Sequence, residues 1–143
     1  MHMLGFNHTL AGSIIAIITP APLVPVIAFA SHFILDATPH FGRSKRVYPY
    51  SKPFIGLLVG DAVLCTTALL FAMWLFPDRW FILAVGAFFS TLPDFLWLLE
   101  GRVPWLKHYF AFAHWIQWGE RPYGWIFDVI YACVFTFILV SLR

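Results

Sequence analysis

Three long apolar segments constrain this chain more than any other feature of its sequence. They cover residues 54–76, 80–99 and 123–142, and each is long enough to cross a hydrocarbon core of about 30 Å as a helix. Of the 143 residues, 61% are hydrophobic and only 11% are charged, whereas soluble domains are usually about a quarter charged. We therefore expect an all-α integral membrane protein, folded as a single domain over residues 1–143, with these segments as three transmembrane helices.

A shorter apolar stretch near the start of the chain has a different pattern. It covers residues 7–38 and is interrupted by Pro20, Pro22 and Pro25. Its first part, residues 7–19, makes roughly 20 Å of helix, which is too short for an upright span. We expect a proline-hinged hairpin of two short helices, partly sunk in the membrane and covered there by other helices.

The distribution of Lys and Arg predicts the topology. Residues 41–53 contain four of the nine cationic residues, so the positive-inside rule makes this basic loop cytoplasmic. Residues 102–121 carry three more, and within them residues 108–118 form an aromatic, amphipathic segment that we expect to lie as an interfacial helix. The net charge of +2 is too small to indicate a nucleic-acid partner. We expect a multi-pass protein of the inner cell membrane, with membrane lipid around it.

Ionisable residues inside the apolar segments gather at one level of this topology. A charged acid at the bilayer centre costs roughly 2.5–3.5 kcal/mol on insertion scales, so such residues indicate a function. The acids within apolar segments are Asp36, Asp61, Asp94 and Asp128. All four, together with five of the six histidines, are expected near the cytoplasmic leaflet. We therefore expect a single polar pocket that faces the cytoplasm.

His32, Asp36 and His40 are spaced four residues apart and form the strongest motif in the chain. Positions i, i+4 and i+8 share one face of a helix, and Pro39 predicts that this helix ends at Thr38. Two imidazoles and a carboxylate suit zinc or another divalent first-row transition metal. The alternative is a hydrogen-bonded histidine–carboxylate pair without a metal.

Three further residues are candidate metal ligands. His8 opens the first short helix, although it could instead form a hydrogen bond at the interface. Asp94 follows a proline that is expected to kink its helix toward the pocket, and its other possible role is to cap a restarted helix. His114 is chosen over His108 because Gln117 lies three residues further on, on the same helix face.

Two acids are candidates for catalytic proton transfer. Asp61 lies about two turns inside its span and could act on a proton, orient a histidine or bond to a neighbouring helix. Glu120 could serve as the general acid or base, or form an interfacial ion pair with Arg121. For Asp128, a place in the site and a hydrogen bond between helices are equally consistent with the sequence.

Short motifs resemble the YdjM-like group of bacterial inner-membrane metal-dependent hydrolases. They are HTLAG at residues 8–12, HFILD at residues 32–36 and LPD at residues 92–94. The order His32, Asp36, Pro39 and His40 is also similar to the His-x-x-x-Asp…Pro…His signature of zinc-dependent phospholipase C. This resemblance implies that the two histidines and the aspartate bind zinc and that the reaction is hydrolysis of a phosphoester.

Together these features predict a membrane-embedded metal-dependent hydrolase that acts on a lipid-like substrate at the cytoplasmic leaflet. One alternative is a transporter or channel subunit that conducts protons or metal ions, although the far half of the predicted membrane region is nearly empty of polar residues. Another is a structural membrane protein whose polar residues only hold helices together.

Overall fold

The computed structural model of the protein describes residues 4–42 and 52–143. This part of the chain is mostly helical, which confirms the predicted all-α class. Its α-helices are α1 (Gly5–Ile18), α2 (Val24–Asp36), α3 (Lys52–Leu75), α4 (Trp80–Leu96), α5 (Lys107–Ile116) and α6 (Trp125–Ser141). Two strands of two residues each, β1 (His40–Phe41) and β2 (Glu120–Arg121), complete the regular structure.

Two of the described helical segments, Ile55–Leu75 and Pro77–Leu99, are long and apolar enough to cross a membrane. In the first of them only 11% of the most apolar window is buried inside the protein. The sequence predicted a third span over residues 123–142. There the structure forms α6, an apolar helix of 17 residues, which makes about 25 Å of helix and is short for a 30 Å core.

The proline-rich stretch near the start of the chain forms two short helices, α1 and α2, where the sequence predicted a hairpin. A 3₁₀ turn (Ala21–Leu23) joins them, with Pro20 directly before it and Pro22 within it. Pro25 lies in the first turn of α2, where a missing backbone N–H costs no helical hydrogen bond. The prolines therefore end one helix and begin the next.

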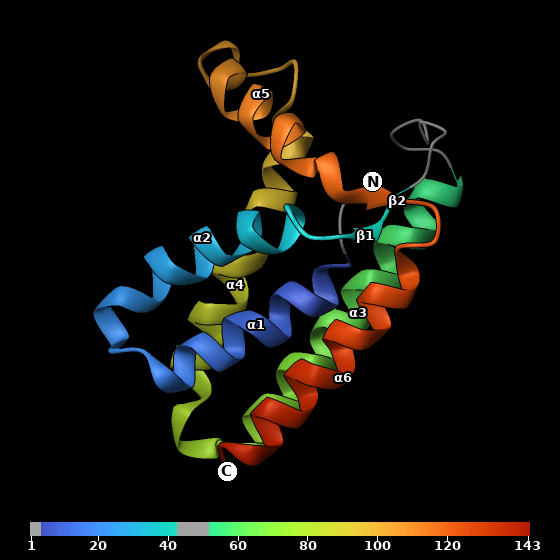
Figure 1. The fold of residues 1–143 in the computed structure, drawn as a ribbon. Helices are drawn as coiled ribbons and strands as arrows, with labels where there is room; N and C mark the ends of the chain where they lie inside the picture. The colour runs from blue at the N-terminus through green and yellow to red at the C-terminus, as the bar shows by residue number, and fades with distance from the viewer. Residues whose placement is uncertain (1–3, 43–51) are drawn as a thin grey trace.

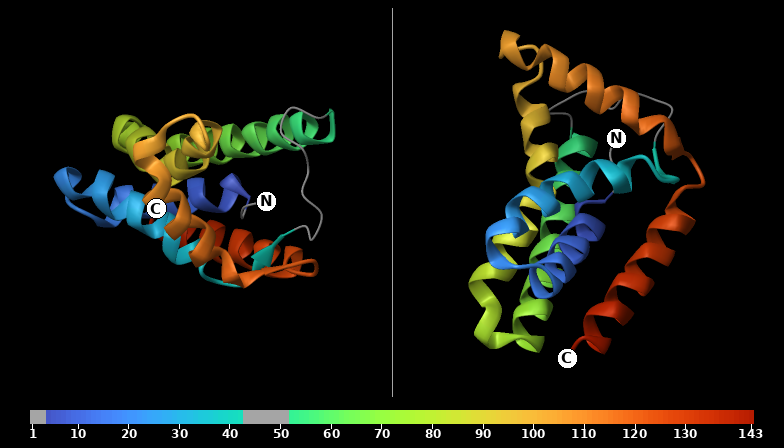
Figure 2. Two further views of the ribbon diagram at one scale, coloured as in Figure 1. Left: turned by 90° about the horizontal axis from the view of Figure 1, so that it is seen from above. Right: turned by 60° about the vertical axis from the view of Figure 1, so that its left-hand side comes forward.

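Helix α1 is central to the fold, because it packs against α2, α3, α4 and α6 (Figures 1 and 2). Its closest approach is to α4, where Gly12 and Gly86 face one another. A Cβ atom added to either glycine would meet the backbone oxygen of the other. Gly12 and Gly86 thus permit close contact between α1 and α4, as small residues commonly do between apolar helices.

Polar and apolar residues occupy opposite ends of the bundle. The buried apolar core draws on five helices and contains Leu10, Ile14, Ala16, Val24, Ala68, Ala72, Leu75, Leu83 and Leu139. Most of these residues lie toward the end at which α6 finishes, where the guanidinium of Arg143 lies 5.3 Å from the ring centre of Trp74. The buried polar residues lie at the other end, where α1 begins and α2 and α4 finish.

A short parallel pairing of β1 with β2 holds the chain that follows α2 against the chain that precedes α6. His40 pairs with Glu120 and Phe41 with Arg121. Two glycines allow this close approach, since a Cβ atom on Gly119 would meet the carbonyl of Thr38 and one on Gly124 would meet that of His40. The predicted basic loop, residues 41–53, falls largely outside the described residues.

Helix α5 extends from the end of the molecule opposite the C-terminus (Figure 1). It corresponds to the aromatic segment that the sequence placed at the interface. Trp105, Trp115 and Trp118, which lie in or beside this helix, are each more than 60% exposed. Aromatic side chains on an exposed amphipathic helix are typical of a membrane–water boundary.

Candidate metal centre

His8, His32 and Asp36 are the described residues that come together as candidate ligands of a metal ion. Each offers one ligand atom, and these atoms all lie within 4.8 Å of one another. His8 comes from the first turn of α1, while His32 and Asp36 lie one turn apart on α2. All three side chains are buried. The group could therefore hold a metal ion.

The orientation of His32 is fixed by α4. Its Nδ1 atom lies 2.8 Å from the carbonyl oxygen of Ser90. A carbonyl can only accept a hydrogen bond, so Nδ1 carries the proton and donates it, and in the neutral ring Nε2 is left with a free lone pair. Histidines that bind metals usually have this second-nitrogen hydrogen bond, because it sets the tautomer and aims the ligand atom.

The distances around Asp36 fit ligand atoms of a common ion. Nε2 of His32 lies 3.3 Å from Oδ2 of Asp36, and Nε2 of His8 lies 3.4 Å from Oδ1. These separations are longer than ordinary N–H···O hydrogen bonds. Two ligands on a tetrahedral zinc ion, with bonds near 2.1 Å, are roughly 3.4 Å apart. Each histidine approaches a different oxygen of Asp36 at a distance compatible with a shared ion, and one ligand atom from each of the three residues lies within 4.8 Å of the others.

Among the residues of the centre, His8 has the side chain with the fewest hydrogen bonds. Its ring stacks on that of His32, with 4.0 Å between the ring centres and 22° between the planes. Neither of its nitrogens has a hydrogen-bond partner among the described residues. Buried polar atoms in native proteins almost always have a partner, and a bound ion would supply one here.

Unsatisfied polar atoms are concentrated in this part of the molecule. Within the described residues the buried side-chain atoms without a hydrogen bond are Asn7 Oδ1, His8 Nδ1 and Nε2, Asp36 Oδ1, His40 Nε2 and Asp94 Oδ1. Three of these atoms belong to His8 and Asp36, and the others come from Asn7, which directly precedes His8, and from two residues that interact with the histidines of the centre, His40 and Asp94. Helices α2 and α4 also finish here, and the negative end of a helix dipole favours a cation.

Asp94 lies at the edge of the group, with Oδ1 3.8 Å from Nε2 of His32. It follows Pro93 in the last turn of α4. The hydroxyl of Tyr109 donates a hydrogen bond of 3.4 Å to the Pro93 carbonyl, which ties α5 to this turn. Burial raises the pKa of the Tyr109 phenol above its usual value, so the hydroxyl keeps its proton.

Gln117 was not among the site residues that the sequence predicted. Its amide nitrogen lies 3.4 Å from Oδ2 of Asp36 and donates to that oxygen. Asp36 therefore contacts side chains from α1, from α2 and from the 3₁₀ turn Gln117–Gly119. The sequence did contain a signal for this residue, since Gln117 was expected on the same helix face as His114. That position was interpreted only as support for His114.

His40 lies past the end of its helix, in β1, because α2 ends at Asp36, two residues before the predicted end at Thr38. It is fully buried, its Nδ1 donates to the carbonyl of Thr38 at 2.8 Å, and its Nε2 has no hydrogen-bond partner among the described residues. It lies close enough to His8 for their charges to interact. His40 thus belongs to the surroundings of the group and not to the set within 4.8 Å.

The structure does not bring His114 to the centre. Its Nε2 lies 2.7 Å from Oε1 of Glu100, and both side chains are about half exposed. The ring of Trp97 lies edge-on to that of His114, with 4.6 Å between their centres. α5 projects from the bundle, so the face that carries His114 meets the end of the 3₁₀ turn Trp97–Leu99 instead of α2.

The two residues predicted for proton transfer, Asp61 and Glu120, lie outside the metal centre. The carboxylate of Asp61 accepts backbone hydrogen bonds from Gly5 at 3.0 Å and Phe6 at 3.3 Å, so it caps the start of α1 from α3. The backbone of Glu120 pairs with His40 in the short sheet, and its side chain lies against Gly42. Neither acid is in the group of His8, His32 and Asp36.

Asp128 forms hydrogen bonds between elements, which was one of its two predicted roles. Its carboxylate accepts a hydrogen bond of 3.1 Å from the backbone of Phe41, and its other oxygen faces the amide of Asn7 at 3.5 Å. The Asn7 amide also donates to the Asp128 carbonyl at 3.1 Å. These bonds link α6 to α1 and to β1. Asn7, which the sequence interpretation missed, directly precedes His8.

Comparisons of the chain with protein-family models, with curated proteins and with solved structures found no match.

Proposed function

We propose that the protein is a membrane-embedded metal-dependent hydrolase whose ion is held by His8, His32 and Asp36. The observation that carries the proposal is the convergence of three buried ligand atoms from two helices to within 4.8 Å. The hydrogen bond that fixes His32 on Ser90 supports it, because this bond leaves Nε2 free to face the other two residues.

Zinc is the ion that this set of ligand atoms suits best. Imidazole nitrogen and carboxylate oxygen are both common zinc ligands, and a set of two histidines and one acid leaves a position for substrate. Asp94, with an unpartnered buried oxygen near His32, lies beside this set without completing it. A bound zinc ion supplies a Lewis acid that polarises the bond to be hydrolysed.

The chain's own residues prepare this chemistry. Ser90 sets the tautomer of His32, and Gln117 holds one oxygen of Asp36. Helix α1, packed against four other helices, keeps His8 stacked on His32. The centre is thus preorganised by backbone and side-chain contacts and excludes water on most sides.

A membrane location is supported by the exposed apolar surface of the helices. Large apolar side chains along α3, α4 and α6 are exposed, including Val59, Leu70, Phe81 and Phe137, each more than half exposed. Many exposed large apolar side chains are costly in water and favourable in lipid. The polar end of the bundle also carries Arg102, Lys107 and Arg121, so the positive-inside rule would place the centre at the cytoplasmic leaflet of the inner membrane.

The proposed position of the centre within the membrane favours a lipid-like substrate. The ligand atoms lie on helices whose outer faces are apolar, so a substrate that reaches them has to partition into the membrane. Hydrolysis of a phosphoester is the reaction implied by the resemblance to zinc-dependent phospholipase C.

Elemental analysis of detergent-purified protein tests the proposal. Wild-type protein, purified without chelators, is expected to contain stoichiometric zinc, and His32→Ala and Asp36→Ala are expected to lose it. His114→Ala is the matched control, because this exposed histidine should not affect the metal content. Wild-type protein without stoichiometric transition metal would overturn the proposal and favour a structural role for the polar residues. Metal retained in both site variants would instead refute the ligand assignment.

A further inference from the structure

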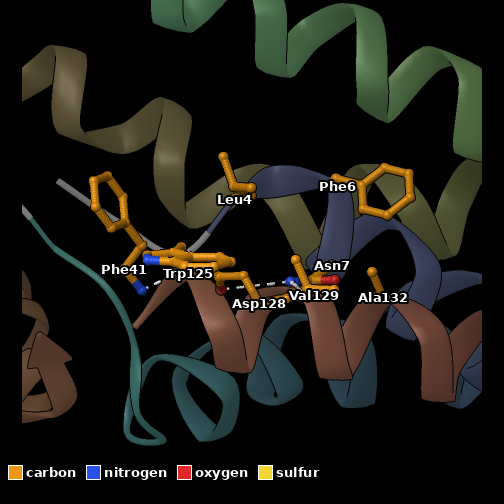
Figure 3. Close-up of a pocket in the computed structure, with 8 residues that line it drawn as sticks. All are labelled: Leu4, Phe6, Asn7, Phe41, Trp125, Asp128, Val129 and Ala132. Atoms are coloured by element: carbon orange, nitrogen blue, oxygen red, sulfur yellow. Dashed lines mark hydrogen bonds between the residues drawn. The ribbon is translucent and has the colours of Figure 1, made fainter. Parts of the chain in front are cut away.

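A cavity of about 400 Å³ lies between the first turn of α1 and the first half of α6 (Figure 3). Its apolar walls are formed by Leu4, Phe6, Phe41, Trp125, Val129 and Ala132. The volume falls within the range of about 300–1,000 Å³ that is typical of small-molecule sites. The walls favour an apolar occupant.

The two polar residues of the wall, Asn7 and Asp128, are largely occupied with each other. The Asn7 amide nitrogen donates to the Asp128 carbonyl, and the Asp128 carboxylate accepts the backbone N–H of Phe41 (Figure 3). Both Asp128 atoms that face Asn7 can only accept hydrogen bonds, so the nitrogen of the amide must point toward them. These acceptors therefore determine which end of the Asn7 amide is the nitrogen and which is the oxygen.

One polar atom of the Asn7 side chain in the cavity wall is unpartnered. The amide oxygen of Asn7 points away from Asp128 (Figure 3), is buried and has no hydrogen-bond partner among the described residues. A buried acceptor without a donor costs free energy. The cavity thus combines an apolar interior with one place for a hydroxyl or an N–H group.

Two residues of the cavity wall are next in sequence to buried histidines. Asn7 directly precedes His8, and Phe41 directly follows His40. On α6 the wall residues Trp125 and Val129 are also more than half exposed, beside other exposed apolar side chains of the same helix. An acyl chain from the surrounding membrane is therefore the apolar group most able to enter.

We propose that this cavity binds the acyl chain of a monoacyl lipid, whose hydroxyl group donates a hydrogen bond to the amide oxygen of Asn7. The inference rests on the proposed function in one respect, since such a lipid would be the substrate class of the adjacent metal centre. Binding itself requires only the cavity and Asn7.

Fluorescence of Trp125 reports on the occupant. The probe is a monoacylglycerol with a brominated acyl chain, titrated into protein in a detergent without bromine, because bromine quenches a nearby indole. Trp125→Phe identifies the part of the signal that comes from this residue. We expect saturable quenching of the Trp125 signal, reversed by unbrominated monoacylglycerol. The brominated methyl ester, which has no donor, should bind roughly 2- to 10-fold more weakly.

Two variants narrow the cavity and leave both polar residues in place. Ala132→Phe and Val129→Phe should reduce quenching strongly. Val134→Phe adds the same ring on α6 at an exposed position outside the cavity walls and should leave quenching unchanged. Equal quenching by alcohol and ester, unaffected by Ala132→Phe, would show that bulk lipid or detergent occupies the space and would overturn the proposal.

The test separates this inference from the proposed function. His32→Ala, which should lose the metal, is expected to bind the probe as the wild type does. Probe binding by a protein that proves to contain no metal would refute the hydrolase and leave the lipid site standing. A metal-loaded protein that fails to bind the probe would refute the lipid site alone.

Discussion

Nδ1 of His32 on α2 donates a hydrogen bond to the carbonyl oxygen of Ser90 on α4, 2.8 Å away. Ser90 lies one turn before Asp94, so one helix face provides both the carbonyl that orients the histidine and the acid that approaches its other nitrogen. The two helices together orient Nε2 of His32 toward the other candidate ligands.

Removal of the metal should destabilise the protein, because an ion that binds only the folded state stabilises it. At a free ion concentration a hundred times the dissociation constant this contribution is about 2.7 kcal/mol. Thermal unfolding in detergent, with and without a strong chelator, measures the effect. Wild type should show a lower Tm with chelator, whereas Asp36→Asn should unfold at the same temperature in both conditions. An identical Tm for wild type with and without chelator would contradict the prediction.

Gln117→Leu should weaken metal binding without removing a ligand. Gln117 donates to Oδ2 of Asp36, and loss of such a supporting hydrogen bond typically costs 10- to 100-fold in metal affinity. Competition with a fluorescent zinc chelator provides the measurement. His114→Ala, on the neighbouring helix α5, serves as the control and should keep wild-type affinity. Unchanged affinity in Gln117→Leu would mean that the contact with Asp36 does not support the centre.

Substitution of Gly12 or Gly86 by alanine should destabilise the fold. Each added Cβ atom would meet the backbone oxygen of the other glycine, and α1 and α4 would have to separate. Overpacking of this kind costs about 1–3 kcal/mol. Gly56→Ala and Gly60→Ala on α3 are matched controls, since no atom lies within 4 Å of a Cβ at either position. These controls should be neutral or more stable by about 0.5–1 kcal/mol, because alanine favours helix more than glycine does.

Asp61→Ala should reduce stability and leave the metal in place. The substitution removes the acceptor for the backbone N–H groups of Gly5 and Phe6, and loss of a helix N-terminal cap costs about 0.5–2 kcal/mol. Asp61→Asn keeps one acceptor oxygen and should lose less. Unfolding in detergent and zinc content, measured on the same samples, separate the two effects. Zinc loss from well-folded Asp61→Ala would restore this acid as a site residue.

The features predicted best from the sequence are those that the geometry of a single helix determines. His32 and Asp36 lie four residues apart, so their common face followed from helical geometry, and α2 holds them as expected. The prolines likewise predicted where α1 ends and α2 begins. These features depend on local backbone geometry, which neighbouring residues decide.

Contacts between distant segments were harder to predict. The packing of α6 decides which acceptors bind the Asn7 amide and helps to decide which neighbours His8 meets. No local sequence pattern encodes this packing. His114 was assigned to the centre because Gln117 was expected on the same helix face, whereas α5 projects outward and His114 pairs with Glu100. Asp61 was assigned a catalytic role because burial of an acid indicates function, yet the start of a neighbouring helix is an equally good partner for a carboxylate.

The bond between Asn7 and Asp128 joins residues 121 positions apart, and this separation has a consequence for biosynthesis. Helix α1 is synthesised well before α6, which carries the hydrogen-bond partner of its polar end. Until α4 and α6 have been made, His32 lacks the Ser90 carbonyl and Asn7 lacks the Asp128 carbonyl as hydrogen-bond partners. The polar end of the α1–α2 hairpin therefore keeps unpartnered polar groups during translation, and it reaches its final packing only after α6 has been synthesised.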